Sequence, residues 1–442
     1  MKKLLDAVDK HRQLILDAER YIWNNPETGY REYKTTAYLE EKFTELGYDL
    51  VKAEGITGFY TRIDTGRPGP ELLILGEMDS VICSTHPECD KETGAVHSCG
   101  HHAQCAALLG IAAALKEPGA LDGLSGAIRL CAVPAEELLE LEFRSKLKAE
   151  GKIKYFGGKP EFLRRGMFDG VDLALMVHTA ETYSVRYGSV GCIAKKIIYK
   201  GKAAHAGGAP WEGVNALYAA MNGMNAVNAI RETFKEPDQL RFHPIITKGG
   251  DIVNAIPATA EIETYIRGKT FKAITDVNKR INRALAGAAV SIGARLEIID
   301  IPGYAPLNNS MDMIEVAKEA MAIALPDETF TVRPVYGTGC TDMGDLSAIM
   351  SAIHPYCPGG VGTGHGSDYY ITDPEAACLG SAKLQLGMIK VLLSDGAERA
   401  KKIVADFVPE FASKDEYLAF LDTLDAAGEH VVYNDDGSVT VK

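Results

Sequence analysis

The strongest constraint on the fold is a stretch in which a buried strand, a loop rich in metal ligands and a helix follow one another. The apolar run Leu72–Leu75 leads into Gly76-Glu77-Met78-Asp79, and Val96-His97-Ser98-Cys99-Gly100-His101-His102 follows. From Ala103 to Leu115 the sequence is apolar and rich in alanine, which predicts a buried helix. This pattern is typical of open α/β sheets, whose ligands bind where the strands end.

Composition limits the class of protein. The chain has 442 residues, 46% hydrophobic and 24% charged, so it can bury a large core and form more than one domain. A net charge of −13 argues against nucleic acid or an anionic membrane as the main partner. No stretch approaches the roughly 18 apolar residues of a membrane span. Nine cysteines without framework spacing predict a reduced, cytoplasmic protein.

The pattern of elements predicts an α/β domain with a mostly parallel sheet, interrupted by a smaller α+β domain. Helical periodicity covers residues 4–23 and 35–46, and apolar runs around Tyr60, around Leu73, at 126–133 and at 171–177 predict strands. Residues 138–170 are charged and helix-prone, and we interpret them as an insertion between two strands. The segment could cover the cleft and alter which acyl group fits.

From about Gly188 the order of predicted elements becomes βαββαβ, which suits a ferredoxin-like domain with helices on one face of an antiparallel sheet. We therefore expect the first part of the α/β domain at residues 1–187, the smaller domain at 188–302, and the second part of the α/β domain at 303–442; the resemblance described below implies that the α/β parts are catalytic and that the smaller domain is a lid or dimerisation domain. The last residues, around Tyr433 to Gly437, are expected to form a surface hairpin of no evident function.

Five residues of metal-binding type fall at strand exits or in glycine-rich loops: Cys99, His101, Glu137, His178 and His365. Thiolate, imidazole and carboxylate can share one ion, so their positions predict a metal site. His354 is a rival for the last ligand, and we prefer His365 because its loop is richer in glycine. A structural zinc site made by Cys83, Cys89, Cys99 and Cys105 is a weaker alternative, because the paired CxxC spacing is missing.

Two adjacent acids, Glu136 and Glu137, follow the apolar run that ends at Pro134. Near a metal, one carboxylate can bind the ion while its neighbour takes a proton from the activated water. Identical roles would place like charges side by side, which is unfavourable. The alternative is a solvated acidic pair at the start of a loop.

Six motifs occur in one order along most of the chain. They are Glu77-Met78-Asp79, His97-Ser98-Cys99-Gly100-His101, Pro134-Ala135-Glu136-Glu137, Ala204-His205-Ala206-Gly207, Gly249-Gly250 with Asn254-Ala255-Ile256-Pro257, and Thr341-Asp342-Met343-Gly344-Asp345. As an ordered set they resemble the metallohydrolases of peptidase family M-twenty. Within it they are most similar to the amidohydrolase branch, which includes N-acyl amino acid hydrolases, aminobenzoyl-glutamate hydrolases and certain dipeptidases.

The resemblance implies a two-metal hydrolase whose lid domain mediates a homodimer. By motif position it implies metal ligands at Cys99, His101, Glu137, His178 and His365, a general base at Glu136, a carbonyl-polarising His205 in the lid, and substrate-carboxylate contacts from Asn254 and Arg267. Many relatives have Asp where this chain has His102, so a partner of the metal ligands is expected to differ.

We therefore expect metal-dependent hydrolysis of an amide bond in a small N-acyl amino acid or an aminobenzoyl-glutamate-like conjugate. Two divalent ions are expected, zinc or manganese, with cobalt or nickel also compatible with the donor set. The alternatives are a metallo-dipeptidase or carboxypeptidase, and a non-catalytic binding protein on the same scaffold. No nucleic acid or membrane is expected as a partner.

Overall fold

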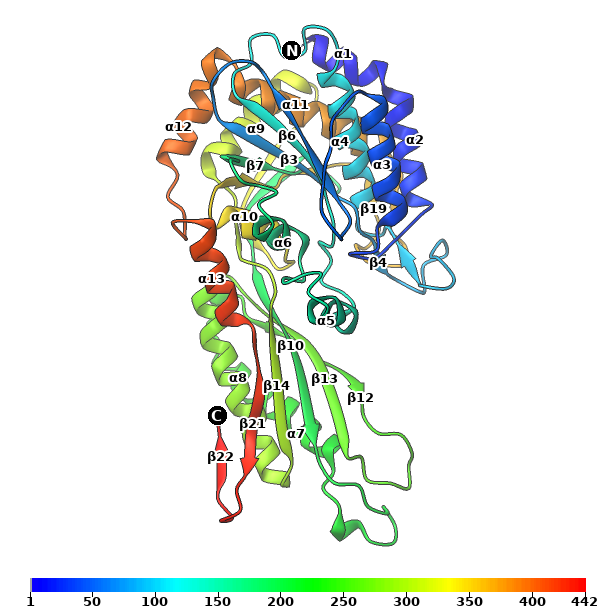
Figure 1. Ribbon diagram of the computed structural model, residues 1–442, viewed down its shortest axis with the longest axis vertical. Helices are drawn as coiled ribbons and strands as arrows, with labels where there is room; N and C mark the ends of the chain where they lie inside the picture. Colours follow the sequence, from blue (N-terminus) through cyan, green and yellow to red (C-terminus); the bar gives the residue numbers. More distant parts are fainter. Residues whose placement is uncertain (1) are drawn as a thin grey trace. The chain divides into compact units, whose positions relative to one another are not determined.

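The computed structural model describes residues 2–442, which form two compact units (Figure 1). Unit 1 contains the chain up to Gly188, Leu307–Tyr336 and Thr341–Lys414. Unit 2 contains Ser189–Pro306, Gly337–Cys340 and Asp415–Lys442. An α/β catalytic domain with an inserted α+β domain is thus the observed fold class.

The main sheet of unit 1 has six strands and is built around strands that are parallel and buried on both faces. The strand order is β1 (Val51–Lys52), β2 (Phe59–Asp64), β6 (Ala127–Val133), β3 (Glu71–Glu77), β7 (Leu173–Leu175) and β17 (Ser351–Ile353). β3 runs parallel to β6 and β7, and every residue of β3 and β6 is buried. Both strands therefore end at the same edge of the sheet.

Helices cover this sheet, and α4 is buried along its whole length. The helices of unit 1 are α1 (Lys2–Lys10), α2 (Arg12–Trp23), α3 (Tyr33–Glu45), α4 (His101–Leu115), α5 (Leu141–Ala149), α6 (Gly158–Arg164), α9 (Met311–Ala324), α10 (Met343–Ser347), α11 (Ser381–Leu393) and α12 (Glu398–Asp406). One helix was expected over residues 4–23, whereas the structure has α1 and α2 with a break at His11. Hydrophobic periodicity continues across such a break, so sequence does not reveal it.

Smaller sheets lie beyond the ends of the main strands. One contains β15 (Leu307–Asn308), β9 (Ser184–Ser189), β18 (Tyr356–Cys357) and β8 (His178–Thr179), with β16 (Thr331–Gly337) paired to β9. Two-stranded pairs are formed by β4 (Val81–Ile82) with β5 (Ala95–Val96) and by β19 (Gly360–Val361) with β20 (Tyr370–Ile371). His178 is the first residue of β8, and His365 lies in the loop between β19 and β20.

Unit 2 has a seven-stranded antiparallel sheet. Its elements are β10 (Gly191–Lys200), α7 (Ala216–Arg231), β11 (Arg241–Phe242), β12 (Ile245–Lys248), β13 (Thr259–Gly268), α8 (Phe271–Ile292), β14 (Arg295–Pro302), α13 (Lys414–Leu424), β21 (Ala426–Tyr433) and β22 (Val439–Val441). Every second residue of β13 is buried, as expected for a sheet with one face against helices. The expected βαββαβ order is present between β10 and β14, except that its second strand is divided into β11 and β12.

The C-terminal segment differs from the expectation. Residues 415–442, assigned from the sequence to the second catalytic part, belong to unit 2, where β21 pairs antiparallel with β14 (Figure 1). Val431 of β21 is fully buried in the core of this unit. The segment is therefore part of a folded sheet, because an edge strand satisfies its backbone hydrogen bonds by joining a distant neighbour.

Among residues 2–442, one helical stretch is long and apolar enough to cross a membrane by length and composition, where the sequence pattern predicted none. It covers Glu375–Leu393 and joins a π-helical turn (Glu375–Gly380) to α11. Of this window, 78% is buried inside the protein, and Leu384 and Leu392 belong to the core of unit 1. Buried core helices pass the same test of length and hydropathy.

Candidate metal centre

The parallel pairing of β3 and β6 brings two pairs of acids to one edge of the sheet. Glu77, the last residue of β3, is in register with Val133 at the end of β6. Asp79 follows the first strand, and Glu136 and Glu137 follow the second. The Asp79 carboxylate accepts a hydrogen bond from the Glu137 backbone N–H at 2.8 Å, which ties the two strand exits together.

Cys99 and His101 lie on either side of Gly100, the residue that precedes α4. Gly100 occupies the N-cap position with φ of 90°, in the left-handed region. A Cβ at this position would overlap the side chains of Thr179 and Tyr369. Glycine is therefore required for the Cys-Gly-His turn to present both ligands toward the strand ends.

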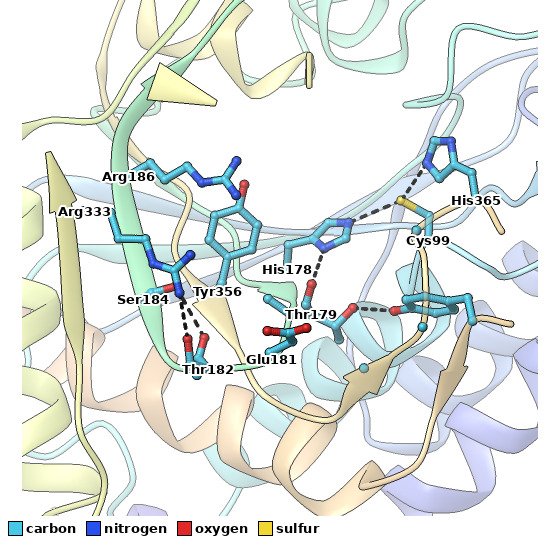
Figure 2. Close-up of a pocket in the computed structure, with 15 residues that line it drawn as sticks. Cys99, His178, Thr179, Glu181, Thr182, Ser184, Arg186, Arg333, Tyr356 and His365 are labelled. Atoms are coloured by element: carbon cyan, nitrogen blue, oxygen red, sulfur yellow. Dashed lines mark hydrogen bonds between the residues drawn. The ribbon is translucent and has the colours of Figure 1, made fainter. Parts of the chain in front are cut away.

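The Cys99 thiol lies between two histidines that come from distant parts of the sequence (Figure 2). Its Sγ is 3.4 Å from His178 Nε2 and 3.3 Å from His365 Nε2. His365 Nε2 is also 3.0 Å from Glu137 Oε1. His365 has a φ of 63°, a strained value for a residue with a side chain, and its N–H donates to Ser98 O at 2.8 Å.

The other nitrogen of two of these rings is held by an oxygen. His101 Nδ1 lies 3.0 Å from the Asp79 backbone oxygen and 3.2 Å from its carboxylate. His178 Nδ1 lies 2.9 Å from Thr179 O. Because Nδ1 faces an oxygen, each ring is held in one orientation and presents its Nε2 to the other candidate ligands, as in metal-binding histidines.

Ligand atoms converge in three groups of three within the described residues. The groups are Cys99 with His101 and His178, Cys99 with Glu137 and His365, and Glu77 with His101 and Glu136, and in each the ligand atoms lie within 4.8 Å of one another. A thiolate, imidazole nitrogens and carboxylates form a donor set that suits zinc and also manganese, cobalt or nickel. The residues present therefore fit divalent metal ions.

The charges of the site favour the metal-binding forms of its acids. Burial disfavours the Cys99 thiolate, but the positive charges of His101 and His178 lower the pKa of this thiol to about 6. Burial likewise opposes ionisation of Glu137, and the hydrogen bond from His365 lowers the pKa of that carboxyl to about 2. Hydrogen bonds to Cys99 and Glu137 raise the pKa of His365 to about 11.

The pKa of Glu136 is shifted in the opposite direction from those of Cys99 and Glu137. Burial and the negative charges of Glu77 and Glu137 raise the pKa of this carboxyl well above its usual range. The residue is 7% exposed, and its Oε2 lies 3.9 Å from His101 Nε2. A buried carboxyl with a raised pKa is typical of a group that exchanges a proton with substrate.

A buried ion-pair network lies behind these residues. Lys159, from the 138–170 segment, places its Nζ 2.5 Å from Glu77 Oε1 and also pairs with Asp342. Glu77 Oε2 is in turn 3.1 Å from His101 Nε2. Lys159, Glu77 and Asp342 are all almost completely buried. The network supports the positions of the residues at the end of β3.

The insertion segment is also tied to the metal centre through Arg144, which is 1% exposed. Its guanidinium donates to the backbone oxygens of Glu137 and Phe156. Sequence reasoning assigned no role to Arg144, Lys159, Asp79 or Asp342. Asp79 and Asp342 stand in recognised motifs, whereas the arginine and lysine lie in a charged, helix-prone segment that has no local signal of burial.

His354, the alternative to His365 as the last ligand, and His102, which stands where many relatives have Asp, both have other partners. His354 is 4% exposed and stacks on His178 at a centroid distance of 5.8 Å, but it belongs to none of the three groups of ligand atoms among residues 2–442. His102 Nε2 lies 3.2 Å from Glu19 Oε1, and its ring meets the ring of Trp23 edge-on. Glu19 of α2 is thus the partner of this residue.

The three remaining predicted residues belong to unit 2. His205 is exposed, and its Nδ1 accepts hydrogen bonds from the N–H groups of Gly207 and Gly208. Asn254 is exposed in the loop after β12, and Arg267 of β13 donates to Thr338 O at 3.2 Å. The structure thus gathers Cys99, His101, Glu136, Glu137, His178 and His365 in unit 1 and places His205, Asn254 and Arg267 in unit 2.

Comparisons with known proteins agree with the motifs. Residues 187–292 match the peptidase dimerisation domain of the M-twenty type. The human Xaa-Arg dipeptidase is 27% identical, over 79% of this chain and 78% of its own length. One of the two p-aminobenzoyl-glutamate hydrolase chains of Escherichia coli (strain K12) is also 27% identical, over 66% of this chain and 58% of its length.

A solved structure shares the fold. A Bacillus subtilis protein described as a dinuclear metal binding peptidase superposes with a TM-score of 0.65 and 20% identity, covering 87% of this chain and 99% of that protein. The resemblance drawn from the motifs is confirmed by these relationships. The chain is a relative of the M-twenty peptidases and amidohydrolases and, like them, a hydrolase of amide bonds.

Proposed function

We propose that the protein hydrolyses the amide bond of a small N-acyl amino acid or of an aminobenzoyl-glutamate-like conjugate with two divalent metal ions. The observation that supports this most is the convergence of Cys99 with His101, His178, Glu137 and His365 beside the buried Glu136. Two of the three ligand groups share Cys99. The metal is proposed to be zinc or manganese, with cobalt or nickel as further candidates.

In this mechanism, Cys99, His101, Glu137, His178 and His365 would hold the metal ions, which when bound would supply an activated water and polarise the amide carbonyl. Glu136 accepts a proton from that water and delivers it to the nitrogen of the leaving amine. Its buried position, with Oε2 3.9 Å from His101 Nε2, suits a carboxyl that holds the proton between the two steps. Asp79 and the Thr179 carbonyl keep the rings of His101 and His178 in one orientation.

The residues of unit 2 complete the proposal. His205 is proposed to stabilise the oxyanion that forms from the amide carbonyl, and Asn254 and Arg267 to hold the substrate's carboxylate.

The match to a dimerisation domain over residues 187–292 supports a homodimer formed through this unit. Light scattering should give the mass of two chains, and a monomer at working concentration would contradict it. A cytoplasmic location is proposed from the nine free cysteines.

A metallo-dipeptidase is the second candidate, and the relationship to the human Xaa-Arg dipeptidase favours it. The two candidates share the metal centre and differ in the group attached to the amide carbonyl. Comparing kcat/KM for a set of dipeptides with that for the corresponding N-acetyl amino acids distinguishes them. A non-catalytic binding protein would hydrolyse neither set.

The test of the mechanism is the substitution Glu136→Gln. It keeps the size of the side chain and removes its ability to accept a proton, so we expect unchanged metal content and a kcat lower by about 10²–10⁴-fold. Glu142→Gln, on α5 with its side chain 79% exposed, is the matched control and should retain full activity. Parent-like turnover by Glu136→Gln with a full metal complement would remove Glu136 as the general base.

A further inference from the structure

A cavity of about 390 Å³ opens beside the metal centre and lies within unit 1. Cys99, His178 and His365 line it on one side, as Figure 2 shows. The opposite side is formed by β9, β16 and β18 and carries Arg186 and Arg333. A substrate whose scissile bond lies at the metal centre would extend one of its groups into this space.

The two guanidinium groups contact neighbours that do not neutralise them, and Arg186 is half-buried whereas Arg333 is exposed to solvent. The Arg186 guanidinium lies over the ring of Tyr356, 5.6 Å from its centroid. Arg333 contacts Thr182 Oγ1 at 3.5 Å. Among residues 2–442, no carboxylate forms an ion pair with either guanidinium, and the one acid that lines the cavity, Glu181, is exposed.

Two unpaired guanidinium groups at the wall of one cavity are unusual in a chain with a net charge of −13. β9 and β16 are paired strands, so the two side chains are presented from neighbouring positions of one small sheet. Guanidinium groups bind carboxylates through two parallel hydrogen bonds, and the low dielectric of a cavity strengthens such contacts. The local positive charge also offsets the repulsion that an anionic substrate meets from the rest of the protein.

We propose that Arg186 and Arg333 bind a carboxylate of the substrate that is additional to its α-carboxylate, so that the natural substrate is a dicarboxylic amide. The extra carboxylate comes either from an acidic amino acid side chain or from a dicarboxylic acyl group. The inference rests on the proposed amide hydrolysis and specifies the substrate class for that site. The ring of Tyr356 contacts the Arg186 guanidinium beside the cavity and carries no charge that would neutralise it.

The experiment compares matched substrates on the metal-loaded protein. N-acetyl-L-glutamate is paired with N-acetyl-L-glutamine, and N-succinyl-L-alanine with N-butanoyl-L-alanine. We expect kcat/KM to favour the acidic member of one pair by about tenfold or more, and the pair that shows the preference identifies the source of the carboxylate. Equal kcat/KM values within both pairs would overturn the inference.

Arg186→Gln and Arg333→Gln should each lower kcat/KM for the preferred acidic substrate by about tenfold, chiefly through KM, and leave the neutral partner within about twofold. Arg399→Gln is the control, because Arg399 is a surface residue of α12 paired with Glu319 and does not line the cavity. Equal losses for the acidic and neutral substrates would show a merely structural role and contradict the proposal.

A binding measurement distinguishes failure of this inference from failure of the proposed function. Calorimetry of N-acetyl-L-glutamate and N-succinyl-L-alanine with metal-loaded Glu136→Gln reports affinity without turnover. If the parent hydrolyses none of the four amides but the acidic compounds bind in an arginine-dependent manner, the proposed function fails and the inference holds. If neutral amides are hydrolysed and neither acidic compound is preferred in binding or turnover, the inference alone fails.

Discussion

Single backbone positions decide whether the metal ligands can meet. Gly100 adopts a left-handed conformation and leaves no room for a Cβ beside Thr179 and Tyr369. His365 and Ala135 also have positive φ values of 63° and 57°, although both carry side chains. Such strain persists where the surrounding structure enforces it, and here it lies on both loops that bring ligands to Cys99.

Replacing Gly100 by alanine should therefore damage the site. The left-handed conformation costs about 1–2 kcal/mol for an L-residue, and the overlap with Thr179 adds to this cost. We expect Gly100→Ala to lower the free energy of unfolding by at least about 2 kcal/mol and to weaken metal binding, measured by urea unfolding and by metal titration.

Gly151→Ala is the matched control, because Gly151 has a φ of 71° and no atom lies within 4 Å of the place that a Cβ would occupy. Its free energy of unfolding should fall only by the conformational cost of about 1–2 kcal/mol, and its metal affinity should be unchanged. An equal effect of both substitutions on metal affinity would contradict the account of Gly100.

The candidate ligands could be predicted from sequence because each lies in a short motif at a strand exit or in a glycine-rich loop. Their charged partners could not. Lys159 and Asp342 are 183 residues apart, and neither residue type suggests burial by itself. From sequence alone, a lysine in a charged, helix-prone segment is expected to be solvated, and only the fold shows that Lys159 lies beside two carboxylates.

At the scale of elements, the 138–170 insertion is a folded support of the metal centre. Glu161 of α6 is fully buried at its side chain. Its carboxylate accepts hydrogen bonds from the backbone N–H groups of Lys154 and Tyr155 and pairs with Arg164 and Arg165. The residue therefore fixes the loop between α5 and α6, which leads to Lys159.

The charge of Glu161 makes a pH-dependent contribution to stability. Burial opposes its ionisation, but the bonds from Arg164, Lys154 and Arg165 lower its pKa below the usual value. A lowered pKa means that the stabilisation is complete above the unfolded-state pKa of about 4.3 and is lost as pH falls through the folded-state value. We expect Glu161→Gln to lower the free energy of unfolding by about 1–3 kcal/mol at pH 7 and by less below pH ~4.

Urea unfolding of the parent and the variant at both pH values checks this expectation. Glu150→Gln is the control in the same segment, since Glu150 forms an exposed pair with Lys152 and should contribute under about 1 kcal/mol. A difference between parent and Glu161→Gln that stays constant or grows toward low pH would contradict the assigned role.

Elements with strong periodicity were predicted well, and elements defined by distant pairing were not. β13 and α8 confirm the third strand and the second helix of the expected βαββαβ order, and both show the expected periodicity of burial. The expected hairpin around Tyr433 to Gly437 is present as β21 paired with β22, but nothing local in Ala426–Tyr433 specifies the pairing of β21 with β14. Strand partners that are far apart in sequence leave no periodic signal.

At the scale of the whole molecule, the chain divides its candidate chemistry between two units. Unit 1 holds the candidate metal ligands, the proposed base Glu136 and the arginine-lined cavity. Unit 2 carries His205, Asn254 and Arg267 and matches a dimerisation domain. The central claim is that unit 1 binds two divalent ions through Cys99, His101, Glu137, His178 and His365.

The most direct test is elemental analysis of protein purified without chelator, with Cys99→Ala and His365→Ala measured beside it. Cys83→Ala is the control, because Cys83 is also half-buried but belongs to none of the ligand groups among residues 2–442. The account predicts about two ions per chain in the parent and the control, and loss of metal in both ligand variants. No bound metal in the parent, even after incubation with zinc or manganese, would contradict it.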